Sequence, residues 1–173
     1  MKRILTIICA MLLVLGVSAQ KKKAIVAYFS ATGTTEAVAK QLAKEAKAEI
    51  YAITPAKAYT SADLDWHNKQ SRSSVEMANE NSRPAIKGKK DLSKYDVIYI
   101  GYPIWWGVAP RIVNTFIEQA NLKGKTVIPF ATSGSSTIDK SVEALKTSYP
   151  NVKWQKGVLL NKPSKEDIKK AIK

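Results

Sequence analysis

The chain has 173 residues, a length that one globular domain with a substantial core accommodates. Hydrophobic residues (45%) and charged residues (24%) lie in the ordinary range for folded proteins, which excludes a disordered chain as the starting expectation. The formal net charge of +14 favours acidic partners, but the lysines are scattered along the sequence, so specific nucleic-acid binding is not expected.

Residues 1–19 have the pattern of a secretory signal peptide. A basic pair, Lys2 and Arg3, precedes an apolar run that ends in small residues before Gln20, where signal peptidase is expected to cleave. An uncleaved membrane anchor is the alternative, although the run is shorter than the roughly 20 residues that span a bilayer. We therefore expect an exported protein, periplasmic or otherwise extracytoplasmic, whose mature domain comprises residues 20–173.

The mature chain would contain no cysteine, because Cys9 lies within the N-terminal apolar run. This excludes disulfides, thiolate metal sites and cysteine nucleophiles. Its charge would fall from +14 to +12, because cleavage removes Lys2 and Arg3 and no acidic residue. Such a charge favours an acidic partner or peripheral contact with an anionic membrane.

Strands and helices alternate from residue 24 onward. Residues 24–29 form an apolar run typical of a strand buried on both faces, and apolar residues at helical spacing predict a helix over 34–47. Residues 48–53 predict a second strand. The segment 54–90 is polar and irregular, with one short helix expected near 73–79.

The second half of the chain continues this alternation. Residues 96–100 predict a strand, Pro110 opens a helix, and residues 126–131 predict the next strand. Residues 152–160 predict a fifth strand, broken near Gly157. Near-continuous apolar strands that alternate with helices indicate an α/β fold, with a parallel sheet covered by helices on both faces.

Two capping patterns mark the starts of the last helices. The spacing Ser136-x-x-Asp139 predicts a side-chain cap for one helix, and Ser164-x-x-Asp167 predicts the same for the final one.

An uncharged, hydroxyl-rich loop separates the first strand from the first helix. It contains Ser30, Thr32, Gly33, Thr34 and Thr35. Ligands of open parallel sheets lie beyond the carboxyl ends of the strands, and the amides at a helix N-terminus suit a phosphate. The absence of lysine excludes a triphosphate loop, and a single glycine excludes the dinucleotide turn. The loop therefore predicts a site for a terminal monophosphate.

Two further loops follow predicted strands. The first of these includes Pro103, Ile104, Trp105, Trp106 and Gly107. Core packing explains one tryptophan, whereas two at the edge of a sheet favour a stacked, flat aromatic ligand. The second includes Thr132, Ser133, Gly134 and Ser135, whose small size lets backbone amides approach a ring edge. Phosphate, flat ring and backbone donors together predict a flavin mononucleotide (FMN) site.

The segments S-x-T-G-x-T, G-Y-P-I-W-W-G and T-S-G-S-S, each after a strand, resemble those of flavodoxins, particularly the short-chain bacterial flavodoxin-like branch. The resemblance covers residues 24–172. It implies a flavodoxin-like three-layer sandwich with a five-stranded sheet in the order 2-1-3-4-5. It also implies FMN as cofactor, with its phosphate on the first segment and its isoalloxazine between the other two. A basic chain with a predicted signal peptide departs from the family's acidic cytosolic carriers and leaves the redox partner open.

The resemblance implies an electron-transfer protein. Two alternatives stay open: an FMN-dependent NAD(P)H or quinone oxidoreductase, and a flavin-free binding module. No carboxylate pair, metal-binding group or nucleophile–base pair is identifiable in the sequence, so no catalytic residue and no metal ligand is assigned. Tyr59, Trp66 and His67 are interpreted as loop residues, with contact to the flavin as the alternative.

Overall fold

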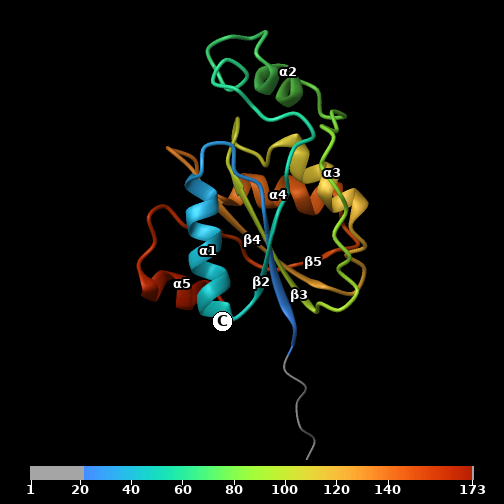
Figure 1. Cartoon of the computed structure of the whole chain (residues 1–173), viewed down its shortest axis with the longest axis vertical. Helices are drawn as coiled ribbons and strands as arrows, with labels where there is room; N and C mark the ends of the chain where they lie inside the picture. Colours follow the sequence, from blue (N-terminus) through green and yellow to red (C-terminus); the bar gives the residue numbers. More distant parts are fainter. Residues whose placement is uncertain (1–21, 173) are drawn as a thin grey trace, which may run out of the picture.

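Residues 22–172 are the part of the chain that the computed structural model describes, and the predicted signal peptide lies outside them. These residues form one sheet with a layer of helices on each face (Figure 1). Within this part, the helices are all too short or too polar to cross a membrane.

The sheet has the order β2-β1-β3-β4-β5, and its neighbouring strands are parallel. The strands are β1 (Ala24–Tyr28), β2 (Glu49–Ala52), β3 (Val97–Pro103), β4 (Thr126–Thr132), β5 (Lys153–Trp154) and β6 (Val158–Leu159). Both β5 and β6 pair with β4, so the fifth strand is interrupted as predicted. The α/β class and the strand order are therefore confirmed.

The interruption at Gly157 has a packing cause. A Cβ atom at this position would lie 2.6 Å from Val142 Cγ2, in the helix that covers this part of the sheet. Glycine therefore allows the chain to pass close beneath that helix between the two short strands.

Strand β3 is longer than predicted, because it runs through Gly101 and Tyr102 to Pro103 instead of ending at Ile100. Gly101 pairs with Phe130 of β4, and a Cβ atom on this glycine would overlap the Phe130 ring. The missing side chain lets the ring cross the strand while the backbone pairing continues. Pro103, predicted as a loop residue, is consequently the last residue of the strand.

The helices are α1 (Thr34–Ala46), α2 (Arg72–Ala78), α3 (Arg111–Gln119), α4 (Asp139–Ser148) and α5 (Lys165–Ala171). Alternation along β1 directs Val26 toward the layer of α1 and α5, and Ile25 toward the layer of α3 and α4. Both side chains are fully buried, as expected for a strand covered on both faces.

The two capping predictions have opposite outcomes. Ser164 and Asp167 form a capping box at the start of α5, as predicted. The prediction for α4 was wrong, because its N-cap residue is Ile138, which makes no side-chain cap. Ser136 does not reach this helix start; its N–H donates to Ser133 Oγ within the preceding loop.

The polar segment between β2 and β3 projects from the sheet, and its two ends are hydrogen-bonded to each other. Pro55 and Ile86 form an antiparallel bridge, and Lys87 N–H donates to Thr54 O at 2.7 Å. The intervening residues, 57–84, carry the predicted short helix α2 and stand above the carboxyl ends of the strands (Figure 1). We call them the 57–84 loop.

Candidate functional site

Three loops meet at the carboxyl edge of the sheet. The first loop (residues 30–35), the second loop (residues 103–110) and the third loop (residues 132–136) follow β1, β3 and β4, which are neighbours in the sheet. The hydroxyls of Thr35 and Thr132 are hydrogen-bonded at 2.8 Å, and both residues are buried. Ile104 N–H donates to Thr132 O at 2.9 Å. The predicted site residues are thus joined by direct bonds between loops.

The first loop ends in a helix start with no side-chain cap. The N-cap of α1 is Gly33, at φ +90°, and its N–H donates to Ser30 Oγ at 3.1 Å. Thr32, Gly33 and Thr34 are exposed, and the space around Gly33 is open for 4 Å. An exposed helix start without a side-chain cap leaves its first amides available to an anion. The Thr35 hydroxyl is already bonded to Thr132, so Thr35 offers an anion its backbone N–H.

The second loop presents a tryptophan at the tip of a tight turn. Trp105 and Val108 exchange two backbone hydrogen bonds of 3.0 Å, which close a two-residue turn over Trp106 and Gly107. Their φ values of +49° and +80° are those of a type I′ turn. A non-glycine residue at positive φ is strained, and such strain often marks a functional position. The Trp106 side chain is 49% exposed at this tip.

Trp105 packs inward, in contrast to Trp106. Its ring lies edge-on to Phe29 and to Tyr59, with centroid separations of 5.6 Å in both cases. Phe29 and Tyr59 also touch each other edge-on at 5.7 Å. We call these three rings the aromatic cluster. One tryptophan is therefore half-buried and the other is near solvent, so packing accounts for only one of the two.

The third loop uses much of its own hydrogen-bonding capacity. Ser133 Oγ accepts from the N–H of Ser135 at 3.3 Å and of Ser136 at 2.8 Å. Ser133 N–H donates to Asn161 Oδ1 at 2.9 Å, and Asn161 Nδ2 donates to Ser133 O at 2.7 Å. Gly134 is exposed in open space between these anchored residues.

Asn161 and Tyr59 are the residues of this edge whose position the sequence did not indicate. Asn161 bonds a residue 28 positions earlier, and a single asparagine after a strand carries no local signal for such a contact. Tyr59 lies in the irregular segment, where its ring contact with Trp105 depends on tertiary folding. Trp66 and His67, by contrast, are exposed and stack on each other, with ring centroids 3.5 Å apart.

The tyrosines at this edge are neutral phenols. Burial, together with a hydrogen bond to Glu76, raises the pKa of Tyr59 far above its ordinary value. Burial likewise raises the pKa of Tyr102 to about 12, and its hydroxyl lies 3.0 Å from Ser141 Oγ. These groups keep their protons at neutral pH, and each hydroxyl is engaged by a neighbouring side chain.

The flavodoxin family model matches residues 23–173, nearly all of the described chain. The chain belongs to the flavodoxin family. Among curated proteins, no relative of this flavodoxin-family chain matches.

Solved structures agree with this assignment. The chain is 56% identical to a candidate flavoprotein from Bacteroides eggerthii, with a TM-score of 0.85, over 87% of this chain and 95% of that one. It is 58% identical to another from Bacteroides uniformis, with the same TM-score, over 87% and 97% of the two chains. A flavoprotein from Lactobacillus acidophilus, solved in complex with FMN, shares the fold at 22% identity and a TM-score of 0.70, over 88% and 100%.

In this flavodoxin-family chain, the carboxyl edge of the sheet carries groups suited to a flavin: hydrogen-bond donors for the phosphate and aromatic rings for the isoalloxazine. The first loop offers neutral hydroxyls and uncapped amides, and the second offers aromatic faces. Lys140 of α4 lies across the second loop, with its Nζ 3.6 Å from where a Cβ atom of Gly107 would stand. A cation beside an aromatic loop adds to the attraction of this edge for an anionic ligand.

Proposed function

We propose that the protein binds FMN at the carboxyl edge of the sheet and serves in electron transfer. The observation that carries the proposal is the uncapped start of α1, which lies in the loop bonded to the third loop and adjacent to the aromatic second loop. When bound, FMN supplies reversible one- and two-electron transfer, and the protein supplies the binding, the orientation and the electrostatic surroundings.

In this proposal, the first loop holds the phosphate. Thr32 and Thr34 are exposed hydroxyls on either side of Gly33, whose open surroundings leave room for an anion. The first-turn amides of α1 add the positive end of the helix dipole. The Ser30 hydroxyl accepts from Gly33 N–H and so shapes the loop, while the buried Thr35 fixes it to β4.

The second and third loops hold the isoalloxazine. Trp105 and Trp106 provide apolar faces, one half-buried and one near solvent. Pro103, Ile104 and Gly107 set the path of the second loop, and the exposed Gly134 lets the third loop approach a ring edge. The solved Lactobacillus relative, which contains FMN, supports the choice of cofactor.

An electron carrier is our preferred role, because the exposed Trp106 gives a partner protein an apolar contact beside the ring-binding loop. A stand-alone FMN-dependent reductase would oxidise NAD(P)H or reduce a quinone without another protein. Steady-state assays with each small molecule distinguish the two roles, since turnover at enzymatic rates would contradict a carrier.

We also propose that the chain works outside the cytoplasm. Removal of residues 1–19 would leave a domain of charge +12, which would attract an acidic redox partner or an anionic membrane. Cell fractionation with N-terminal sequencing tests export, and a full-length cytosolic protein would contradict it. Electron-transfer rates should fall as salt rises, because the Debye length is only about 8 Å at physiological ionic strength.

The visible spectrum of the purified mature protein, followed by a fluorescence titration with FMN, tests the cofactor. A protein that neither carries nor takes up FMN would support a flavin-free module. Thr32→Ala should raise the FMN dissociation constant by about tenfold, since a hydrogen bond to a charged group contributes about 1.5–3 kcal/mol. Thr32→Ser keeps the hydroxyl and serves as the matched control.

A further inference from the structure

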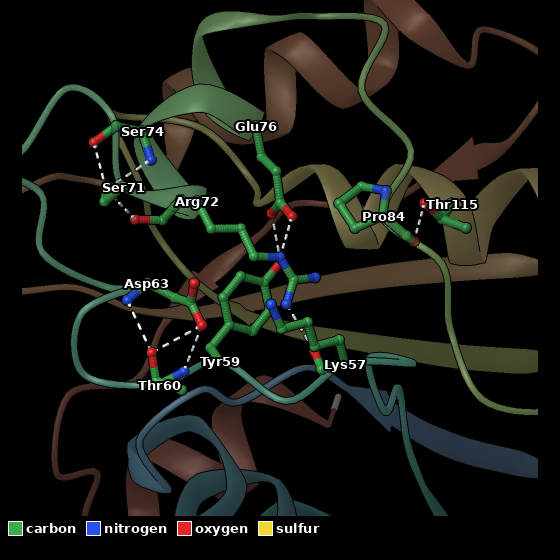
Figure 2. Close-up of polar contacts among 11 residues, drawn as sticks. Lys57, Tyr59, Thr60, Asp63, Ser71, Arg72, Ser74, Glu76, Pro84 and Thr115 are labelled. Atoms are coloured by element: carbon green, nitrogen blue, oxygen red, sulfur yellow. Dashed lines mark hydrogen bonds and ion pairs between the residues drawn. The ribbon is translucent and has the colours of Figure 1, made fainter.

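The 57–84 loop is organised around a largely buried ion pair (Figure 2). Arg72 Nε lies 2.6 Å from Glu76 Oε1 within α2, and the two side chains are only 20% and 13% exposed. Arg72 Nη1 also donates to Lys57 O at 2.7 Å, near the start of the loop. The Arg72 side chain therefore connects α2 to the first residues of the 57–84 loop.

Tyr59 is held against this pair (Figure 2). Its hydroxyl donates to Glu76 Oε2 at 2.5 Å, and the Arg72 guanidinium carbon lies 4.0 Å from the centre of its ring. A guanidinium at this distance makes a cation–π contact. The hydroxyl is thus engaged with Glu76, and the edge-on contacts of the ring go to Phe29 and Trp105.

The far side of the 57–84 loop is fastened to α3. Thr115 Oγ1 donates to Pro84 O at 2.9 Å, and Arg111 Nη2 donates to Met77 O at 3.2 Å. Arg83 and Glu118 form an ion pair of 2.8 Å. Because α3 follows directly after the second loop, the 57–84 loop is anchored to the same element that ends the proposed ring-binding segment.

We propose that Arg72 and Glu76 are positioning residues that hold Tyr59 against Trp105, and that Tyr59 makes the 57–84 loop a wall of the flavin site. The inference rests on the proposed binding of FMN. It adds a fourth segment to a site otherwise built from the three loops, and this segment lies between β2 and β3 instead of following β1, β3 or β4. Without Tyr59, the Trp105 ring would lose one of its two edge-on partners, and its orientation would be less constrained.

The test is a double-mutant cycle on the mature protein, with FMN as the titrant. Tyr59→Leu should raise the FMN dissociation constant by about tenfold, in the range expected for the loss of aromatic contacts. Arg72→Gln should raise it by about three- to tenfold. Because Arg72 acts through Tyr59, the double variant should bind FMN within about twofold of Tyr59→Leu alone. The absorption spectrum of bound FMN should shift in all three variants.

One variant in the same loop is the matched control. Trp66→Ala removes an aromatic ring that is 66% exposed, and it should keep the wild-type FMN affinity and spectrum. Tyr59→Phe keeps the ring and its volume, so it remains informative if Tyr59→Leu does not fold. It should shift the flavin spectrum by releasing the ring from Glu76.

The outcomes separate this inference from the proposed function. If the wild type binds FMN and the Tyr59 variants match it in affinity and spectrum, then the 57–84 loop is not a wall of the flavin site, whereas the proposal of FMN binding stands. Fully additive losses in the cycle would overturn positioning through Tyr59. If the wild type does not bind FMN, the proposed function fails and this inference fails with it.

Discussion

The first and third loops are alike in sequence and different in structure. Both follow strands, both are rich in hydroxyls and both contain one glycine. The first loop leaves the start of α1 without a side-chain cap. In the third loop, Ser133 already accepts from two amides of its own loop and exchanges two hydrogen bonds with Asn161.

This difference separates a loop whose helix-start amides remain available from a loop whose serine and amides are largely hydrogen-bonded already. Hydroxyl content alone predicts polar contacts in both places, but only the bonding pattern shows whether the groups remain available. The buried hydrogen bond between the Thr35 and Thr132 hydroxyls then connects the two loops directly.

The largest expected effect follows from placing a negative charge in the open loop. Gly33→Asp should raise the FMN dissociation constant by about a hundredfold, because two unit charges about 4 Å apart repel by about 1–4 kcal/mol near a protein surface. Gly33→Asn has the same shape at the same positive φ and no charge, so it isolates the electrostatic part. Equal affinities for the two variants, measured by fluorescence titration, would show that Gly33 does not face the phosphate.

A smaller effect is expected in the second loop, where strain and exposure coincide. Trp106→Gly should weaken FMN binding by about tenfold, as expected for one stacked aromatic. It should also stabilise the apoprotein by about 1 kcal/mol, because glycine adopts φ +49° without strain. Titration and chemical denaturation give the two values. A variant that is destabilised and binds FMN normally would make Trp106 a packing residue.

The bond between the two compared loops can be cut without changing shape. Thr35→Val should lower the free energy of unfolding by about 1–2 kcal/mol, because it leaves the buried Thr132 hydroxyl without its partner from the first loop. The double variant Thr35→Val with Thr132→Val should cost less than the sum of the single changes. Additive costs in urea denaturation would indicate that the hydroxyls do not act as a pair.

The smallest effect is expected from loosening the third loop. Asn161→Ala removes both hydrogen bonds to Ser133, which lie in an exposed setting, and should cost about 1 kcal/mol of stability. FMN affinity should fall by only about threefold, equivalent to less than 1 kcal/mol, since the loop retains its own serine contacts. Asn161→Asp keeps the acceptor and loses the donor, so an intermediate cost is expected. Amide hydrogen exchange at Ser133 would report the loosening directly.

The sequence predicts most of the fold because its signals are local. Apolar strands that alternate with periodic helices indicate the layers, and the resemblance to flavodoxins implies the strand order. The first loop is visible for the same reason, since an uncharged hydroxyl run joins a strand directly to a helix.

The remaining features depend on contacts between distant residues. The extension of β3 depends on the Phe130 ring crossing Gly101. The role of Asn161 depends on a partner 28 residues away, and the place of Tyr59 depends on Trp105. Each requires the folded chain, because no pattern within a few residues records it.

The antiparallel bridge between Pro55 and Ile86, at the base of the 57–84 loop, bears on how this protein can be altered. Because the two ends of the 57–84 loop are neighbours, the loop is a side branch that interrupts no strand pairing. We expect that it can be shortened to a tight turn, or exchanged for another segment, with the order of the sheet kept. The architecture thus separates the sheet and its first loop from a segment whose replacement should leave the strand order intact.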